Sequence, residues 1–326
     1  MANAITGTPA LSASPTNYSG TNSQLGAAIQ GIWSKEILFQ AMPILRFEQF
    51  AVKKTELGVQ PGLTINFMRY NNLGKASQLV EGVRMETNAL SATQFSITVA
   101  EHGYAVAVSE LLLNASFDDV MASASRLLGR NMAQYLDESA RDTLLTASST
   151  IYGYDKSGLT RTANSPYDHG TVAANRDAIT VDTKFTTAVV KDAVETLATK
   201  NVPRLGETYV CFIHPHQSRQ LRDDPEFIEV TKYAAPGNFM LGEIGRLNDV
   251  VFIETTQIKQ VANTGGVPVY QSLFLGDNAF GHAISLPVEL RDGGILDFGR
   301  EHALAWYSIW GLGLITDQSV LKAETA

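Results

Sequence analysis

The chain has 326 residues, a formal charge of −8 and a single cysteine, Cys211. The acidic balance argues against a protein that grips nucleic acid over a large surface, because such binding requires a basic face. One cysteine excludes a disulfide within the chain. The first basic residue is Lys35, and the longest apolar stretch, 303–315, is too short to span a membrane. We therefore expect a cytoplasmic product that carries no signal peptide.

The N-terminal segment predicts an arm rather than part of a globular fold. Residues 1–28 carry no charged side chain and are rich in small polar residues. Such a segment cannot bury enough apolar surface to offset the entropy that it loses on ordering. We expect a neighbouring subunit to hold it. A short amphipathic helix is predicted at 29–42, where Trp33 and Ile37 share a face and Pro43 ends the helix.

Residues 47–108 predict a long hairpin. Apolar and polar side chains alternate over 63–68 and again over 95–100, as in two half-buried strands. A change of parity at Gly103 predicts a bulge. The stretch between the two strands is polar and has no core close to it in the sequence. We interpret its mixed charges as contacts to another subunit, carried by Lys75, Glu81, Arg84 and Glu86, and we expect Trp33 of the preceding helix to be a fifth contact residue.

The strongest helical pattern of the chain runs from 116 to about 147, with Leu128, Tyr135 and Leu144 among its apolar positions. We expect this apolar stripe to pack on strands of the same subunit. A helix of roughly 30 residues is about 45 Å long, which is unusual in a globular domain. Residues 148–180 are loop-like, and a second helix is predicted at 182–200. Its apolar stripe is Phe185, Val189, Ala193 and Leu197. Further strands are predicted at 208–213, 250–253, 270–275, 288–290 and, last, 302–315, with a helix from 215 to 221.

Candidate catalytic and metal sites are weak. His214 and His216 lie near Asp223 and Asp224, but the proline between the histidines breaks the regular geometry of a metal site. Cys211 stands in an apolar strand and is interpreted as a small buried hydrophobe. Nucleophile-elbow, phosphate-loop and dinucleotide-binding motifs are missing from the sequence. We predict no catalytic, cofactor or metal site.

The order of the predicted elements resembles the Hong Kong 97-type fold of tailed-bacteriophage major capsid proteins. That order is a polar arm, a long hairpin, one very long helix, a mixed α/β unit and a late return strand. Local segments are similar to recurrent segments of the same family: 33–38, 213–224, 242–254 and 275–281.

The resemblance implies an α+β fold and a division of the chain into named parts. These are an N-terminal arm with a short helix at 1–46, an E-loop hairpin at 47–108, a P-domain with its spine helix at 109–180, an A-domain at 181–284, and return strands with the C-terminus at 285–326.

The resemblance also implies a function. Copies of a structural, non-enzymatic protein would form hexamers and pentamers of an icosahedral virion shell around double-stranded DNA, which they contact without sequence specificity. Assembly would take place in the cytoplasm of the host bacterium. Since no scaffolding domain fits before Trp33, a separate scaffolding protein and a portal are expected, and decoration proteins remain open. Lys75 lies in the hairpin where some members form a crosslink, but no matching asparagine or activating carboxylate was found, so that chemistry is not carried over.

Two alternatives stay open at this point. An encapsulin-like nanocompartment resembles the same fold but encloses enzymes, and a pocket for a cargo peptide would favour it. A small-molecule enzyme that uses His214 and nearby acids belongs to another class. A buried pocket with converging polar groups would favour the enzyme.

Overall fold

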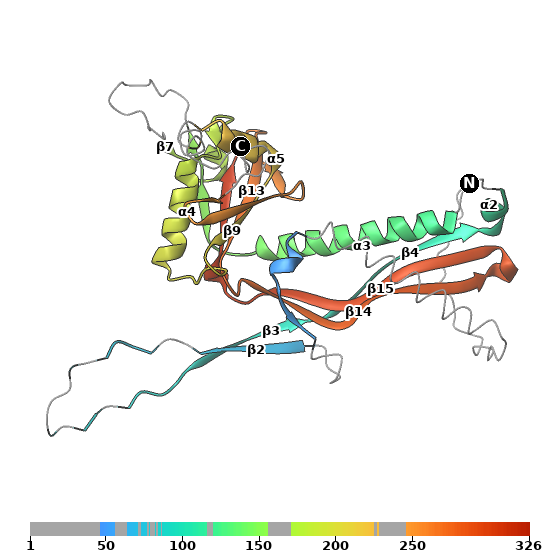
Figure 1. Ribbon diagram of the computed structural model, residues 1–326, viewed down its shortest axis with the longest axis horizontal. Helices are drawn as coiled ribbons and strands as arrows, with labels where there is room; N and C mark the ends of the chain where they lie inside the picture. The colour runs from blue at the N-terminus through green and yellow to red at the C-terminus, as the bar shows by residue number, and fades with distance from the viewer. Residues whose placement is uncertain are drawn as a thin grey trace.

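The computed structural model describes residues 46–55, 64–70, 87–115, 120–155, 171–224 and 246–326, with residue 227 and isolated positions between 73 and 85. These parts form an elongated molecule with an α/β body at one end, a long helix lying along a strand ladder, and a projecting hairpin (Figure 1). No helix in this part of the chain is long and apolar enough to cross a membrane. The helix predicted at 29–42 lies outside the described residues.

The ladder is a four-stranded sheet. In spatial order its strands are β1 (Val52–Lys54), β14 (Phe280–Leu296), β15 (Glu301–Leu314) and β4 (Ala100–Ser109). The sequence indicated only 288–290 of β14, because the alternation is clear over that short run and irregular elsewhere. A 3₁₀ turn, η4 (Asp297–Gly299), joins β14 to β15 at the tip of the ladder.

The long helix α3 (Val120–Leu144) covers one face of this sheet. Leu128 is 1% exposed and packs with Leu290, Leu304 and Trp306, which confirms the predicted contact between the helix stripe and strands of the same subunit. A short helix, α2 (Glu110–Ala115), precedes α3 in the chain, and the predicted start of the long helix at 116 lies outside the described residues. Tyr135 was expected on the buried stripe but is 41% exposed.

The α/β body is built on a second, seven-stranded sheet. In order its strands are β10 (Arg246–Leu247), β11 (Val250–Glu254), β9 (Tyr209–Ile213), β13 (Pro268–Leu275), β16 (Val320–Thr325) and β5 (Thr150–Tyr152), with β12 (Gln260–Ala262) paired to β13. The prediction that 302–315 is the last strand was wrong, because β16 follows it and pairs with β13 and β5. The strand β16 has only six residues and follows a polar turn, so its sequence does not show a clear alternation of apolar and polar side chains.

Helices α4 (Thr187–Thr199) and α5 (Pro215–Arg222) pack on this second sheet (Figure 1). All four side chains of the predicted stripe are fully buried in its core: Phe185, Val189, Ala193 and Leu197. The helix starts at Thr187 rather than at 182, because 183–184 forms a short strand.

Residues 148–180, expected as loop, also contain short elements: β5, β6 (Tyr154–Asp155), β7 (Thr171–Val172) and η3 (Arg176–Ala178), with β8 (Thr183–Lys184) completing a small sheet. The remaining 3₁₀ turns are η1 (Glu48–Phe50) and η5 (Asp317–Ser319).

The predicted hairpin is confirmed in its two strands. β2 (Thr64–Tyr70) pairs antiparallel with β3 (Ala92–Thr98). The bulge predicted at Gly103 is wrong, since β4 pairs with β15 in unbroken register through Gly103 and Tyr307. The apolar positions shift from odd to even residue numbers because the chain leaves the hairpin sheet at Val99 and joins the ladder as β4. Gly103 is required for another reason: a Cβ there would lie 2.8 Å from the carbonyl oxygen of Trp306.

Candidate functional site

The hairpin exposes a row of large apolar side chains, which we call the hairpin patch. Its members are Met68, Tyr70, Leu73, Met85 and Leu90, each at least 62% exposed. A two-stranded hairpin has marginal stability alone, and several large exposed apolar side chains on one projecting element are candidates for an interaction site. Figure 1 shows the hairpin projecting away from both sheets. The hairpin patch is therefore a candidate contact surface.

Two of the five predicted contact residues can be placed. Lys75 and Arg84 are exposed in the loop of the hairpin, next to members of the hairpin patch. Glu81, Glu86 and Trp33 lie outside the described residues. The sequence pattern led us to expect contacts through charged side chains, whereas the structure also exposes large apolar side chains beside them; large apolar residues in an isolated hairpin were the signal for these.

A second exposed surface, the distal patch, lies at the opposite end of the molecule (Figure 1). It consists of Leu111 and Leu112 on α2, Leu127 on α3 and Phe298 in η4. The backbone N–H of Glu110 donates to the carbonyl of Arg300 at 2.8 Å, which holds α2 against the ladder tip. Phe298 is fully exposed and has a φ of 55°. A large apolar residue in a left-handed, solvent-facing turn costs free energy in the isolated subunit.

The arm root, residues 46–54, lies where the long helix, the ladder and the α/β body meet. The carboxylate of Asp137, on α3, accepts the backbone N–H groups of Arg46 and Phe47 at 2.9 Å each. Burial raises the pKa of Asp137, and these two hydrogen bonds offset part of the effect. The Phe47 ring packs on Phe212 of β9 with centroids 4.3 Å apart. The arm root thus joins α3 to the α/β body.

A buried carboxylate, Glu48, with His282 and the half-exposed Lys53 as partners, fastens the same segment to the ladder. Glu48 is 5% exposed, and its carboxylate lies 3.0 Å from His282 Nδ1 and 2.7 Å from Lys53 Nζ. Burial alone would raise the pKa of Glu48, but the hydrogen bonds with His282 and Lys53 outweigh it and hold that pKa below its usual value. The arm root is therefore held in place within its own subunit, whatever the N-terminal arm before it contacts.

The His214 and His216 cluster has a structural role in the fold. The His214 ring accepts the N–H of His216 at 3.1 Å and caps α5, while both rings lie against Tyr270.

Cys211 is fully buried, as predicted, and burial raises the pKa of its thiol well above the usual value. Within the described residues, no three His, Cys, Asp or Glu side chains are grouped as metal ligands.

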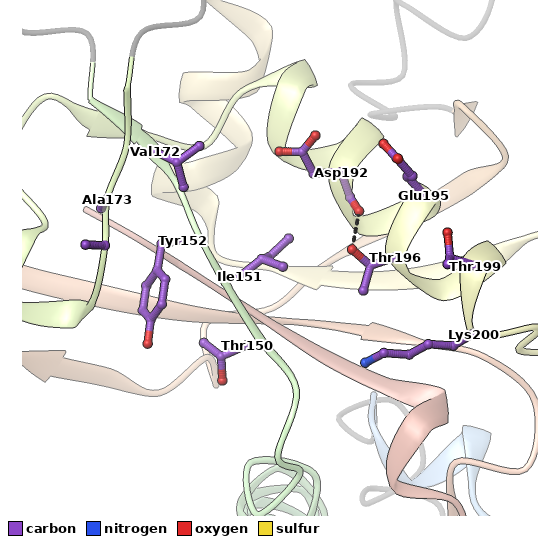
Figure 2. A pocket seen from close by; sticks show the side chains of 11 residues that line it. Thr150, Ile151, Tyr152, Val172, Ala173, Asp192, Glu195, Thr196, Thr199 and Lys200 are labelled. Atoms are coloured by element: carbon purple, nitrogen blue, oxygen red, sulfur yellow. Dashed lines mark hydrogen bonds between the residues drawn. The ribbon is translucent and has the colours of Figure 1, made fainter.

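A groove of about 640 Å³ lies between β5 and α4. Figure 2 shows Asp192 and Glu195 on its helical wall, with Ile151 and Tyr152 on the strand. The hydroxyl of Tyr154 donates to the Asp192 carboxylate, and burial together with that carboxylate raises the pKa of Tyr154 to about 12. Asp192 is therefore already engaged within the subunit.

An elongated subunit with one spine helix on a strand ladder, an α/β body and a projecting hairpin has the Hong Kong 97-type fold of shell-forming capsid proteins. A family model described as phage capsid protein matches residues 92–319. The chain belongs to this phage capsid protein family, as a structural major capsid protein. No curated protein matches the chain in sequence.

Solved capsid structures have the same fold at low sequence identity. The capsid of Ralstonia phage GP4 is 18% identical, with a TM-score of 0.62, over 85% of this chain and 87% of that one. The cyanophage Pam1 capsid is 16% identical with a TM-score of 0.68, over 88% and 92%. The capsid of cyanophage P-SCSP1u is 16% identical with a TM-score of 0.64, over 86% and 88%. The chain is thus similar to these proteins over nearly its whole length and nearly all of theirs.

Proposed function

We propose that copies of this chain close into the icosahedral shell of a tailed-phage virion, as hexamers and pentamers around double-stranded DNA. The observation that carries the proposal is the pair of exposed apolar surfaces at opposite ends of one subunit, the hairpin patch and the distal patch. Two different surfaces on one subunit are what a heterologous contact requires, and such a contact closes into a ring when repeated around an axis.

The DNA inside such a shell is held by weak contacts without sequence specificity. The formal charge of −8 supports this, because tight binding to the lining would need a basic face. A separate scaffolding protein and a portal complete the proposed assembly, which takes place in the host cytoplasm. Decoration proteins are a further partner that this architecture allows.

The experiment that tests the proposal removes the hairpin patch without disturbing the cores. Wild-type chain expressed with its scaffolding protein is expected to form closed shells visible by electron microscopy. A Met68→Glu/Leu90→Glu variant should remain as folded, unassembled subunits, because two charges replace exposed apolar side chains at the contact. The matched control Thr87→Glu/Asn88→Glu adds the same charge at exposed polar positions of the same hairpin. Closed shells from the Met68→Glu/Leu90→Glu variant at wild-type yield would contradict the proposal.

A further inference from the structure

The base of the hairpin crosses the ladder where β4 stops pairing with β15. The β4–β15 register runs from Ser109 opposite Glu301 to Ala100 opposite Trp310, and Val99 then separates β4 from β3. Beyond Trp310, β15 keeps β14 as its partner. Side chains alternate between the faces of a strand, so residues 309, 311 and 313 point away from the face that α3 covers.

Two glycines stand at this crossing, Gly311 and Gly313. A Cβ on Gly311 would lie 2.2 Å from the carbonyl oxygen of Thr98 and 3.0 Å from its carbon. A Cβ on Gly313 would lie 2.8 Å from Cγ1 of Ile97. Neither glycine has a positive φ, so the backbone conformation does not demand glycine. What demands it is the close approach of the crossing strand.

A small core seals the crossing on the same face. Ile65 and Ile97 of the hairpin pack with Val99 and with Ala283 of β14, and Ile309 of β15 lies against them. Ile97 and Val99 are 2% and 5% exposed. The hairpin is therefore seated on the ladder at its base, and among its described residues only Ile65 and Ile97 are buried.

We propose that Gly311 and Gly313 are positioning residues: they form a saddle on β15 that sets the direction in which the hairpin leaves the subunit. The consequence for shell closure rests on the proposed function, in which the hairpin patch meets another copy. The direction itself is a property of the single subunit and can be measured on it.

The two glycines differ in what a methyl group would meet. At Gly311 the obstacle is backbone, which no side-chain rotation can clear. Carbon–oxygen contacts closer than about 3.3 Å are unfavourable, so Thr98 would have to move by about 1 Å. At about 3.3 Å per residue, the strand from Thr98 back to Ala92 is about 20 Å long and amplifies a tilt at its base. At Gly313 the obstacle is the Ile97 side chain, which can be shortened.

The experiment measures the hairpin direction in unassembled subunits. Spin labels on Lys75→Cys and Arg130→Cys report the distance between the hairpin and α3, and the buried Cys211 does not compete for the label. We expect Gly311→Ala to shift this distance by several ångströms with wild-type helix content, and to abolish shells of wild-type diameter. Gly74→Ala is the matched control, because a Cβ there meets nothing within 4 Å. An unshifted Gly311→Ala distance, or an equal shift in Gly74→Ala, would overturn the proposal.

The Gly313 variants keep the proposal testable if Gly311→Ala does not fold. Gly313→Ala should shift the distance less, and adding Ile97→Ala should return it toward the wild-type value, although the double variant is less stable. A shift that persists in the double variant contradicts the saddle. If the distance shifts but shells of wild-type diameter still form, the saddle holds and the proposed assembly role of the hairpin fails.

Discussion

Glu48 and His282 lie 234 positions apart in the sequence, and their side chains meet at 3.0 Å in the interior of the subunit. His282 is 4% exposed, and its ring contacts Trp310 edge-on with centroids 5.7 Å apart. The first strand after the arm, β1, pairs with the segment of β14 that carries His282. The start of the described chain is thus fastened to the ladder by strand pairing and by a buried charge.

The Glu48 carboxylate predicts a pH-dependent contribution to stability. Its pKa is lower in the folded state than in the unfolded chain, so the stabilisation is complete above the unfolded pKa of about 4.5 and is lost as pH falls through the folded pKa. Glu48→Gln keeps the shape and removes the charge. We expect it to cost about 1.5–3 kcal/mol at pH 7, as for hydrogen bonds to charged groups. Urea unfolding at several pH values measures the difference, which should narrow in acid. A difference independent of pH would contradict this assignment.

The adjacent pair Leu127 and Leu128 separates folding from assembly. Leu128 is 1% exposed and Leu127 is 64% exposed on the same helix. Leu128→Ala should lower the free energy of unfolding by roughly 2–5 kcal/mol, because it leaves a cavity under α3. Leu127→Ala should change it by less than about 0.5 kcal/mol, yet reduce shell yield through the distal patch. Thermal unfolding and electron microscopy of both variants check this. Equal stability losses would show that the helix face is misassigned.

Phe298 predicts opposite effects on stability and assembly. Glycine accepts the left-handed conformation of this position without a Cβ penalty, so Phe298→Gly should raise the stability of the free subunit by up to about 1 kcal/mol. The same change removes the most exposed side chain of the distal patch and should lower the yield of closed shells. Chemical unfolding of subunits and counts of closed particles measure the two effects. Unchanged yield would mean that the ladder tip makes no subunit contact.

The N-terminal arm supplies a prediction that rests on sequence alone, since residues 1–45 lie outside the described residues. Deleting 2–27 should leave the melting temperature of isolated subunits nearly unchanged, because an uncharged segment without an apolar period adds little to a core. Closed shells should become rare, because the arm ties one subunit to the next. A solved assembly in which the arm touches only its own subunit would sink the prediction.

Features that depend on local periodicity could be predicted from the amino-acid sequence. The apolar spacing around Leu128 and around Val189 was enough to place both helices and their buried faces, because a helix repeats every 3.6 residues. The strands β2 and β3 followed from alternation in the same way, and the order of elements was enough to indicate the family.

Features that depend on contacts between distant segments became visible in the folded subunit alone. The ends of β3 and β4 are set by which sheet each strand joins, and β16 is recognisable as a core strand only beside β13. Gly311 and Gly313 of β15 leave no room for a side chain because Thr98 and Ile97 of the hairpin lie against them in the folded subunit. Asp137 and Glu48 look like surface carboxylates in the sequence, yet folding buries them against partners 90 and 234 residues away. Periodicity within one segment carries no information about which other segment will cover it.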